Sequence, residues 1–191
     1  MTSDQIKEMQ RKLGVLADGF WGRVSQAALR THLSNLMPRP NPWPAADKFS
    51  MEHFYGKAGD ESQLVSIVPP FPMFYDGKQI KTLRCHKKVA ASLLRVLTAI
   101  GKSYGADRGT MEEAEDFGGC FNYRVKRGGS TLSIHAWGAA IDLDADDNTF
   151  RDTWPTQADM PLEIMEAFAR EGWVSAGAFW GYDAMHFQAT R

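Results

Sequence analysis

Two histidines and one aspartate in the last third of the chain constrain the fold more than any other feature of the sequence. His135 and Asp142 are seven residues apart, and His186 follows much later. An odd spacing places two side chains on opposite faces of an unbroken strand, so a turn must intervene if both are to reach one point. Gly138, next to Ala139, is where we expect that turn.

Two short segments around these residues alternate between apolar and polar side chains. They are residues 140–143 and residues 184–188, and the alternation predicts two strands. Their apolar side chains would face the core, while Asp142 and His186 would face a cleft. The two strands therefore point polar groups at the same spot from distant parts of the chain.

Two imidazoles and one carboxylate with a fourth position left open are the ligand set of a catalytic zinc site. Nitrogen and oxygen ligands also suit a borderline ion such as Zn²⁺. We therefore expect zinc to be bound by His135, Asp142 and His186. The alternative is a pair of structural histidines with hydrogen-bond partners and a solvated aspartate, and spacing alone leaves both interpretations open.

The motifs carry a family resemblance. Ser-x-His-x-x-Gly-x-Ala-x-Asp at residues 133–142 and Asp-x-Met-His at residues 183–186 resemble the zinc D-alanyl-D-alanine carboxypeptidase and L-alanyl-D-glutamate endopeptidase family, which includes many phage endolysins. Residues 118–124 and 127–129 look like the segment that precedes the zinc motif in these enzymes. The similarity covers roughly residues 80–190. It implies a metallopeptidase that acts on peptidoglycan with zinc-activated water.

The resemblance also implies roles for three further residues. Asp183, three positions before His186, is the expected general base, although some branches of the family have glutamate there. Arg124 would stabilise the oxyanion or bind a substrate carboxylate; the alternative is an ordinary surface arginine. Ser133 would bind substrate through a hydrogen bond, with a purely structural hydrogen bond as an equal alternative.

The start of the chain resembles a peptidoglycan-binding repeat. The signature is Met9-Gln10-x-x-Leu13-Gly14, then Asp18-Gly19-x-Trp21-Gly22, then Ala27-Ala28. We expect a helix capped by Ser3 or Asp4, an aromatic loop, and a second helix to about residue 33 with Val24 and Ala28 facing inward. The alternative is a small helical cap packed on the rest of the protein.

Proline content predicts the domain boundary. Residues 37–45 hold four prolines and favour a stiff, extended linker. We therefore expect a helical module at residues 1–36 and a zinc peptidase domain at residues 46–191. The predicted class is α+β, a small antiparallel sheet with flanking helices, preceded by a small all-α helical module.

Other segments give weaker predictions. Periodicity predicts helices at residues 86–100, with His86 exposed at its start, and at residues 161–171. Residues 120–125 alternate enough for a strand, and residues 173–183 read as an aromatic, glycine-rich loop. The acidic run at residues 144–148 lacks the glycine and glutamate of an EF-hand, so a solvated loop is favoured over a cation site.

Composition limits the classes of partner that we expect for this protein. A formal net charge of −1 gives no indication of nucleic-acid binding. Cys85 and Cys120, the two cysteines, are expected to be reduced. The first residues do not resemble a signal peptide and no stretch is long enough for membrane insertion, so we expect a monomer made in the bacterial host cytoplasm that acts on the cell wall after release.

These observations together predict an endolysin. It would cleave a peptide bond of the peptidoglycan stem, by preference L-alanyl-D-glutamate, and so cause bacteriolysis. The alternatives are a D-alanyl-D-alanine carboxypeptidase, a non-catalytic wall-binding protein, and a wall glycosidase that uses paired carboxylates.

Overall fold

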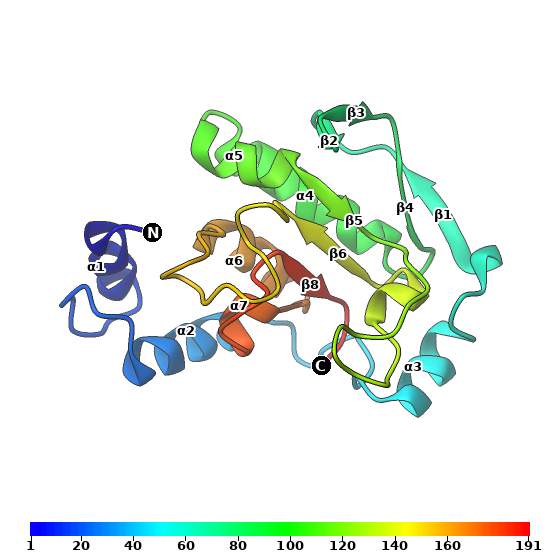
Figure 1. Ribbon diagram of the computed structural model, residues 1–191, viewed down its shortest axis with the longest axis horizontal. Coiled ribbons are helices and arrows are strands. Elements are labelled where there is room, and N and C mark those ends of the chain that lie inside the picture. Colours follow the sequence, from blue (N-terminus) through cyan, green and yellow to red (C-terminus); the bar gives the residue numbers. More distant parts are fainter.

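A four-stranded antiparallel sheet of order β5-β6-β8-β7 lies at the centre of the computed structural model, which describes residues 1–191 (Figure 1). Its strands are β5 (Phe117–Gly119), β6 (Ala140–Leu143), β7 (Val174–Ser175) and β8 (His186–Gln188). Two separate antiparallel pairs join β1 (Leu64–Ile67) to β4 (Leu83–His86) and β2 (Met73–Tyr75) to β3 (Lys78–Ile80). Mixed helices and small antiparallel sheets confirm the predicted α+β class.

Seven α-helices surround these sheets. They are α1 (Ser3–Lys12), α2 (Arg23–Leu36), α3 (Lys48–Tyr55), α4 (Ala90–Tyr104), α5 (Arg108–Glu115), α6 (Leu162–Arg170) and α7 (Ala176–Phe179). Two 3₁₀ helices, η1 (Glu61–Gln63) and η2 (Ile134–Trp137), complete the elements. None of the helices combines the length and the apolar character that crossing a membrane requires.

The core joins the sheet to α4 and α6. Phe168 of α6 stacks on Phe187 of β8 with ring centroids 4.0 Å apart, and both side chains are fully buried. α4 turns Leu93, Leu97 and Ile100 inward, because these apolar residues recur at helical spacing. The predicted strand at residues 140–143 is confirmed, since its apolar residues are buried and the chain pairs with β8.

Three predicted elements are wrong in detail. The helix starts at Ala90 rather than at His86, which ends β4 and is buried, because its ring lies 2.9 Å from the carbonyl oxygen of Tyr55. The strand expected at residues 120–125 lies earlier, in β5, and Asn122 instead donates its backbone N–H to the carbonyl of His135. The loop expected at residues 173–183 contains β7 and α7.

The N-terminal helices also differ from the prediction. Thr2, rather than Ser3 or Asp4, caps α1 through a capping box with Gln5. Val24 is 70% exposed rather than inward. α2 is rotated so that Ser25 faces inward, where its hydroxyl accepts a hydrogen bond from the buried Gln10 side chain at 3.0 Å.

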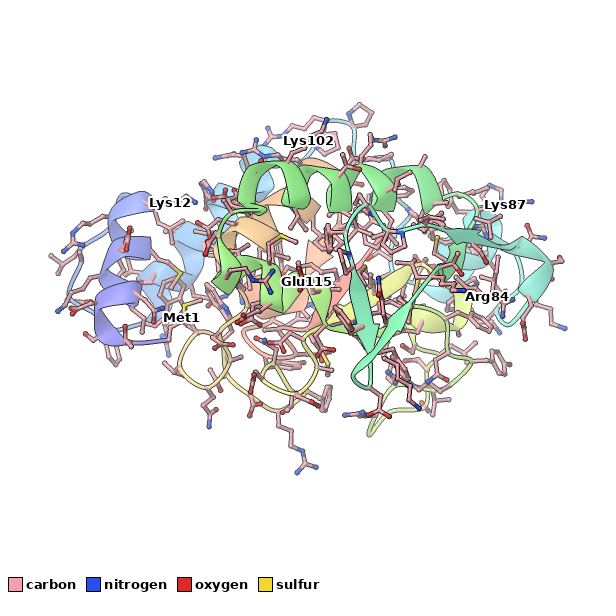
Figure 2. The ribbon with its side chains drawn as sticks, turned by 90° about the horizontal axis from the view of Figure 1, so that it is seen from above. Met1, Lys12, Arg84, Lys87, Lys102 and Glu115 are labelled. Carbon is pink, nitrogen blue, oxygen red and sulfur yellow. The ribbon has the colours of Figure 1, made fainter.

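The N-terminal helices pack on the rest of the protein. Leu29 and Leu33 of α2 are fully buried, and α2 contacts α6 and α7. The Glu166 carboxylate of α6 lies 3.0 Å from Lys12 Nζ and 2.7 Å from His32 Nε2. Figure 2 shows Met1 and Lys12, at the two ends of the α1 segment, at one end of the molecule, with Arg84 and Lys87 at the other. The hydrophobic core is therefore continuous from α1 and α2 into the sheet.

The proline-rich segment is held against the protein as well. Trp43 is buried, lies 6.1 Å from Trp173 between ring centroids, and donates its indole N–H to the carbonyl of Glu171. The backbone N–H of Arg191 donates to the carbonyl of Pro44. The division into a module, a linker and a peptidase domain stays a prediction, but its parts are in close contact.

Candidate metal centre

Strand register brings Asp142 and His186 together. β6 and β8 are antiparallel, and Asp142 lies directly opposite His186 in their ladder. Directly opposed residues have Cβ atoms about 4.5–5.5 Å apart, so both side chains reach the same side of the sheet. The prediction that two distant strands point Asp142 and His186 at the same spot is thus confirmed.

His135 reaches the same spot from η2, just before the sheet. Gly138 ends η2 in the left-handed conformation, with φ +66°. A Cβ on Gly138 would lie 2.7 Å from the Leu64 side chain and 3.0 Å from the backbone nitrogen of His86, so a side chain does not fit there. The expected turn between His135 and Asp142 is therefore present, and glycine is required at it.

Three potential ligand atoms form a nearly equilateral triangle, which we call the histidine cluster: His135, Asp142 and His186. His135 Nε2 lies 3.1 Å from Asp142 Oδ1, His186 Nδ1 lies 3.0 Å from the same oxygen, and the two nitrogens are 3.1 Å apart. Tetrahedral ligands at about 2.0–2.1 Å from zinc lie about 3.3 Å from one another. The triangle therefore fits a zinc ion after a shift of a few tenths of an ångström.

Hydrogen bonds behind the rings turn their lone pairs toward this triangle. His135 Nδ1 lies 2.9 Å from the carbonyl oxygen of Cys120, and His186 Nε2 lies 3.0 Å from Gln188 Oε1. The Gln188 amide nitrogen donates to Thr190, which leaves Oε1 to accept the proton of His186. Each neutral ring thus spends its one N–H on an outer partner and faces Asp142 with a lone pair. Three facing lone pairs are the arrangement that a cation stabilises.

The charges of the histidine cluster depend on one another. Burial alone would raise the pKa of Asp142, but the adjacent imidazoles of His135 and His186, which donate to Asp142 once they are protonated, hold that pKa well below its usual range. Burial likewise works against a charged His186, yet the contact with Asp142 raises the pKa of His186. Both shifts indicate a site that favours positive charge next to Asp142.

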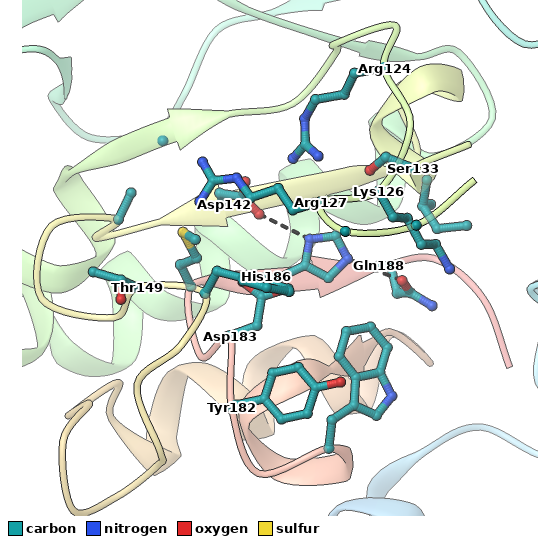
Figure 3. A pocket seen from close by; sticks show the side chains of 18 of the residues that line it. Arg124, Lys126, Arg127, Ser133, Asp142, Thr149, Tyr182, Asp183, His186 and Gln188 are labelled. Carbon is teal, nitrogen blue, oxygen red and sulfur yellow. Dashed lines mark hydrogen bonds and ion pairs between the residues drawn. The ribbon is translucent and has the colours of Figure 1, made fainter. Parts of the chain in front are cut away.

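A cavity of about 760 Å³ opens beside the histidine cluster. All three further residues predicted for the site line it: Arg124, Ser133 and Asp183. Figure 3 shows Asp183 close to His186, with Arg124 and Arg127 on the side of His186 opposite to Tyr182.

These three residues differ in how they are held. Asp183 has a backbone φ of +59° and is half-buried, and burial raises the pKa of its carboxyl group. Ser133 is buried, and its hydroxyl accepts the backbone N–H of His135 at 3.4 Å, so it makes the structural bond that was one of its two predicted roles. Arg124 is half-buried and forms no ion pair, which leaves its guanidinium free for a ligand.

A second cavity of about 490 Å³ also borders the histidine cluster. It shares Asp142, Arg124 and Arg127 with the first cavity, and it also reaches His135 and Arg84. The two cavities therefore meet at the cluster.

Two residues after Asp142 lies a second group of carboxylates, the acidic cluster: Glu113, Asp144 and Asp159. Asp144 is 7% exposed and Asn148 is fully buried, so the expectation of a solvated loop at residues 144–148 is wrong for both. The reason is that Asn148 donates to Asp144 at 2.6 Å and accepts backbone N–H groups of Asp159 and Met160.

The sequence reasoning missed several residues of the site. Gln188 had a usable signal, because it lies two positions after His186 on the same strand and so on the same face. Lys126 and Arg127 line the first cavity from a glycine-rich loop. The contact with the carbonyl of Cys120 could not be predicted, because every residue has a backbone carbonyl group. Cys85 and Cys120 are both buried free thiols, as predicted.

Comparison with known proteins bears on this part of the chain. Residues 127–189, a third of the chain, match a family model described as D-alanyl-D-alanine carboxypeptidase. The matched segment includes the whole histidine cluster and Asp183, whereas Arg124 and the N-terminal helices lie outside it. No curated protein and no solved structure shows a significant match to the chain.

Proposed function

We propose that this protein is a zinc-dependent peptidase that cleaves a peptide bond in the stem of peptidoglycan. The observation that carries the proposal is the histidine cluster, in which three lone pairs converge within 3.1 Å beside a cavity. The match of residues 127–189 to the carboxypeptidase family model supports the same reaction class.

Each residue of the site has a separate role in the proposed reaction. His135, Asp142 and His186 would hold the zinc ion, which when bound lowers the pKa of a water molecule toward about 7 and polarises a carbonyl group. Asp183 accepts a proton from water and returns it to the leaving amine, and burial raises its pKa toward the working range of a general base. Arg124 binds the oxyanion or a substrate carboxylate, and Ser133 borders the bound substrate.

The two cavities favour an endopeptidase over a carboxypeptidase. A carboxypeptidase needs room for only one residue beyond the scissile bond, whereas an endopeptidase needs space on both sides. Cavities of about 760 and 490 Å³ meet at Asp142, which gives space on both sides. We therefore favour L-alanyl-D-glutamate, an internal bond of the stem, over the terminal D-alanyl-D-alanine bond.

Mass spectrometry of digested peptidoglycan tests the proposal, because it identifies the new termini directly. The expected products carry a new N-terminal D-glutamate, and purified protein should also clear a suspension of sacculi. Release of free D-alanine would instead indicate the carboxypeptidase, and cut glycan strands would indicate a glycosidase. A zinc-loaded protein that yields no products would be a wall-binding protein without catalysis. His186→Ala is the matched inactive control.

We also propose that residues 1–36 attach an endolysin of phage type to the wall. Three apolar residues of this segment are largely exposed: Leu16 at 79%, Phe20 at 74% and Val24 at 70%. Deleting the segment would uncover buried Leu29 and Leu33, so point substitutions are the better test. Leu16→Ser with Phe20→Ser should weaken sedimentation with sacculi, whereas Phe49→Ser, at 80% exposure in α3, should not. Unchanged sedimentation of the double variant would contradict the proposal.

A further inference from the structure

One wall of the larger cavity is aromatic. Phe150 and Tyr182 meet edge to face with ring centroids 6.0 Å apart, and Tyr182 lies 6.2 Å from Trp180. Trp180 stacks on His186 with centroids 5.8 Å apart and an angle of 24° between the rings. The row of rings therefore starts at a residue of the histidine cluster and runs away from it along the cavity.

Two of these rings, Trp180 and Tyr182, are exposed to solvent. Trp180 is 40% and Tyr182 is 44% exposed, whereas Trp154 and Trp173 are almost completely buried in the core. The Trp180 and Tyr182 side chains form no hydrogen bond within the protein. Open aromatic faces beside a catalytic cluster are available to a ligand.

The remainder of the two cavities differs in charge from this wall. Arg124 and Arg127 line both cavities where they meet, and the smaller cavity adds Arg84 while its one carboxylate is Asp142 of the histidine cluster. Arg84 is paired with Glu61 at 2.9 Å, but Arg124 and Arg127 form no ion pair. Guanidinium groups without carboxylate partners suit the carboxylates of a substrate. The smaller cavity thus fits an anionic segment, and the aromatic wall fits an uncharged one.

We infer that the Trp180–Tyr182 wall is a subsite for a pyranose ring of the glycan strand. This inference rests on the proposed function, and it adds that the substrate is the stem while still attached to its sugar. A pyranose packs its C–H face on an aromatic ring and leaves its hydroxyl groups at the edge free for hydrogen bonds. In the stem, one alanine and the lactyl ether separate the sugar from the L-alanyl-D-glutamate bond. The carboxylates of the stem lie beyond that bond.

The geometry matches this order. The sugar lies within a few bonds of the scissile carbonyl, and Trp180 lies 5.8 Å from His186 between ring centroids. The D-glutamate side of the bond then falls in the smaller cavity, next to Arg124 and Arg127. A terminal D-alanyl-D-alanine bond is several residues from the sugar, so a carboxypeptidase would leave the aromatic wall without a ring to bind.

Binding of two cleavage-product analogues tests the subsite without relying on turnover. One ligand is N-acetylmuramoyl-L-alanine, and the other is lactoyl-L-alanine, which lacks the sugar. Calorimetry on the zinc-loaded full chain should give at least about tenfold tighter binding of the sugar-bearing ligand. Trp180→Leu keeps apolar volume but removes the ring face, and should bring the ratio of the two affinities close to one. Tyr75→Leu, at 54% exposure on the smaller cavity, should keep the wild-type ratio.

The ratio separates a sugar subsite from a structural role for Trp180, because damage to the histidine cluster would weaken both ligands alike. Zinc content of each variant is measured in parallel. Equal affinity of wild-type protein for both ligands, or an unchanged ratio in Trp180→Leu, overturns the subsite. If the wild type prefers the sugar but cleaves no stem peptide, the subsite stands and the proposed peptidase activity fails.

Discussion

Asp142 and Asp144, two residues apart at one end of β6, belong to two clusters with opposite electrostatics. Asp142 lies among two imidazoles in the histidine cluster, and Asp144 lies with Glu113 and Asp159 in the acidic cluster. Burial opposes ionisation in both places. The imidazoles nevertheless hold the pKa of Asp142 below its usual range, whereas burial and the nearby Asp144 raise the pKa of Glu113 to about 9.

The difference shows that imidazole partners outweigh burial at Asp142, whereas burial prevails at Glu113, which has no such partner. In the histidine cluster every proton donor is turned outward, toward Cys120 and Gln188, so the centre favours a cation. In the acidic cluster Asn148 supplies the donors, and it ties the loop after β6 to the segment before α6. Glu113 Oε2 is buried there without a hydrogen-bond partner. The histidine cluster is thus arranged to accept a cation, whereas the acidic cluster connects two segments of the chain.

The largest expected effect separates the two clusters by metal content. His186→Ala removes one of three ligand atoms, so zinc bound per chain, measured by elemental analysis after dialysis, should fall to near zero and peptidase activity should be abolished. Asp159→Asn in the acidic cluster is the matched control and should retain zinc. Full zinc and full turnover in His186→Ala would refute the assignment of the ligands.

The second effect concerns the proton shuttle that we propose for Asp183 beside the histidine cluster. Asp183→Asn is nearly isosteric, so zinc should stay bound, but an amide cannot accept a proton from water. The chemical step should slow by roughly 10²–10⁴-fold, the usual scale for general acid–base catalysis. Single-turnover kinetics with a stem peptide measures this step.

Two outcomes would contradict that role. Loss of zinc from Asp183→Asn would make Asp183 a ligand and displace one of the three. A near-normal rate with normal zinc would place the base elsewhere. Asp146→Asn, on the same cavity, is the control that should change the rate little.

A smaller effect is expected behind the ring of His186. Gln188→Ala removes the acceptor of its Nε2 proton, and loss of such an outer partner typically weakens metal binding by about 10–100-fold. Gln188→Glu keeps an acceptor and should restore most of the affinity. Competition with a chromophoric chelator measures both. Equal affinity of wild type and Gln188→Ala would mean that the lone pair of His186 is not fixed in this way.

The histidine cluster was predictable from the sequence because the family resemblance pointed to its three residues and short-range rules accounted for their geometry. Strand alternation placed Asp142 and His186 on one face, and Gly138 marked the turn that His135 needs. The same rules failed where the partner is distant or belongs to the backbone. His86 is buried because it meets the carbonyl of Tyr55, and periodicity along one helix cannot detect that contact.

The acidic cluster was not predictable for the same reason. Residues 144–148 look solvated in isolation, and only the fold brings Glu113 and Asp159 to Asp144. α2 turns Ser25 inward together with Leu29 and Leu33, and the buried hydrogen bond between Gln10 and Ser25 is a contact that apolar periodicity does not weigh. Polar contacts between residues far apart in the sequence could therefore not be predicted from local patterns.

The smallest expected effect, on stability, tests the acidic cluster itself. The pKa of Glu113 is about 9 in the folded protein against an ordinary value of 4.5, chiefly because of burial and then of Asp144. Between these pH values the folded carboxyl group keeps its proton while the unfolded one loses it, so its contribution is full below about pH 4.5 and declines as pH rises toward 9. The slope is less than about 1.4 kcal/mol per pH unit, because the side chain is partly screened by solvent. Glu113→Gln cannot ionise, so its free energy of unfolding, from urea titrations at pH 5.5, 7 and 8.5, should fall less than that of the wild type. Glu112→Gln, on the exposed side of α5, should follow the wild type, and equal slopes in all three proteins would mean that Glu113 ionises freely in the fold.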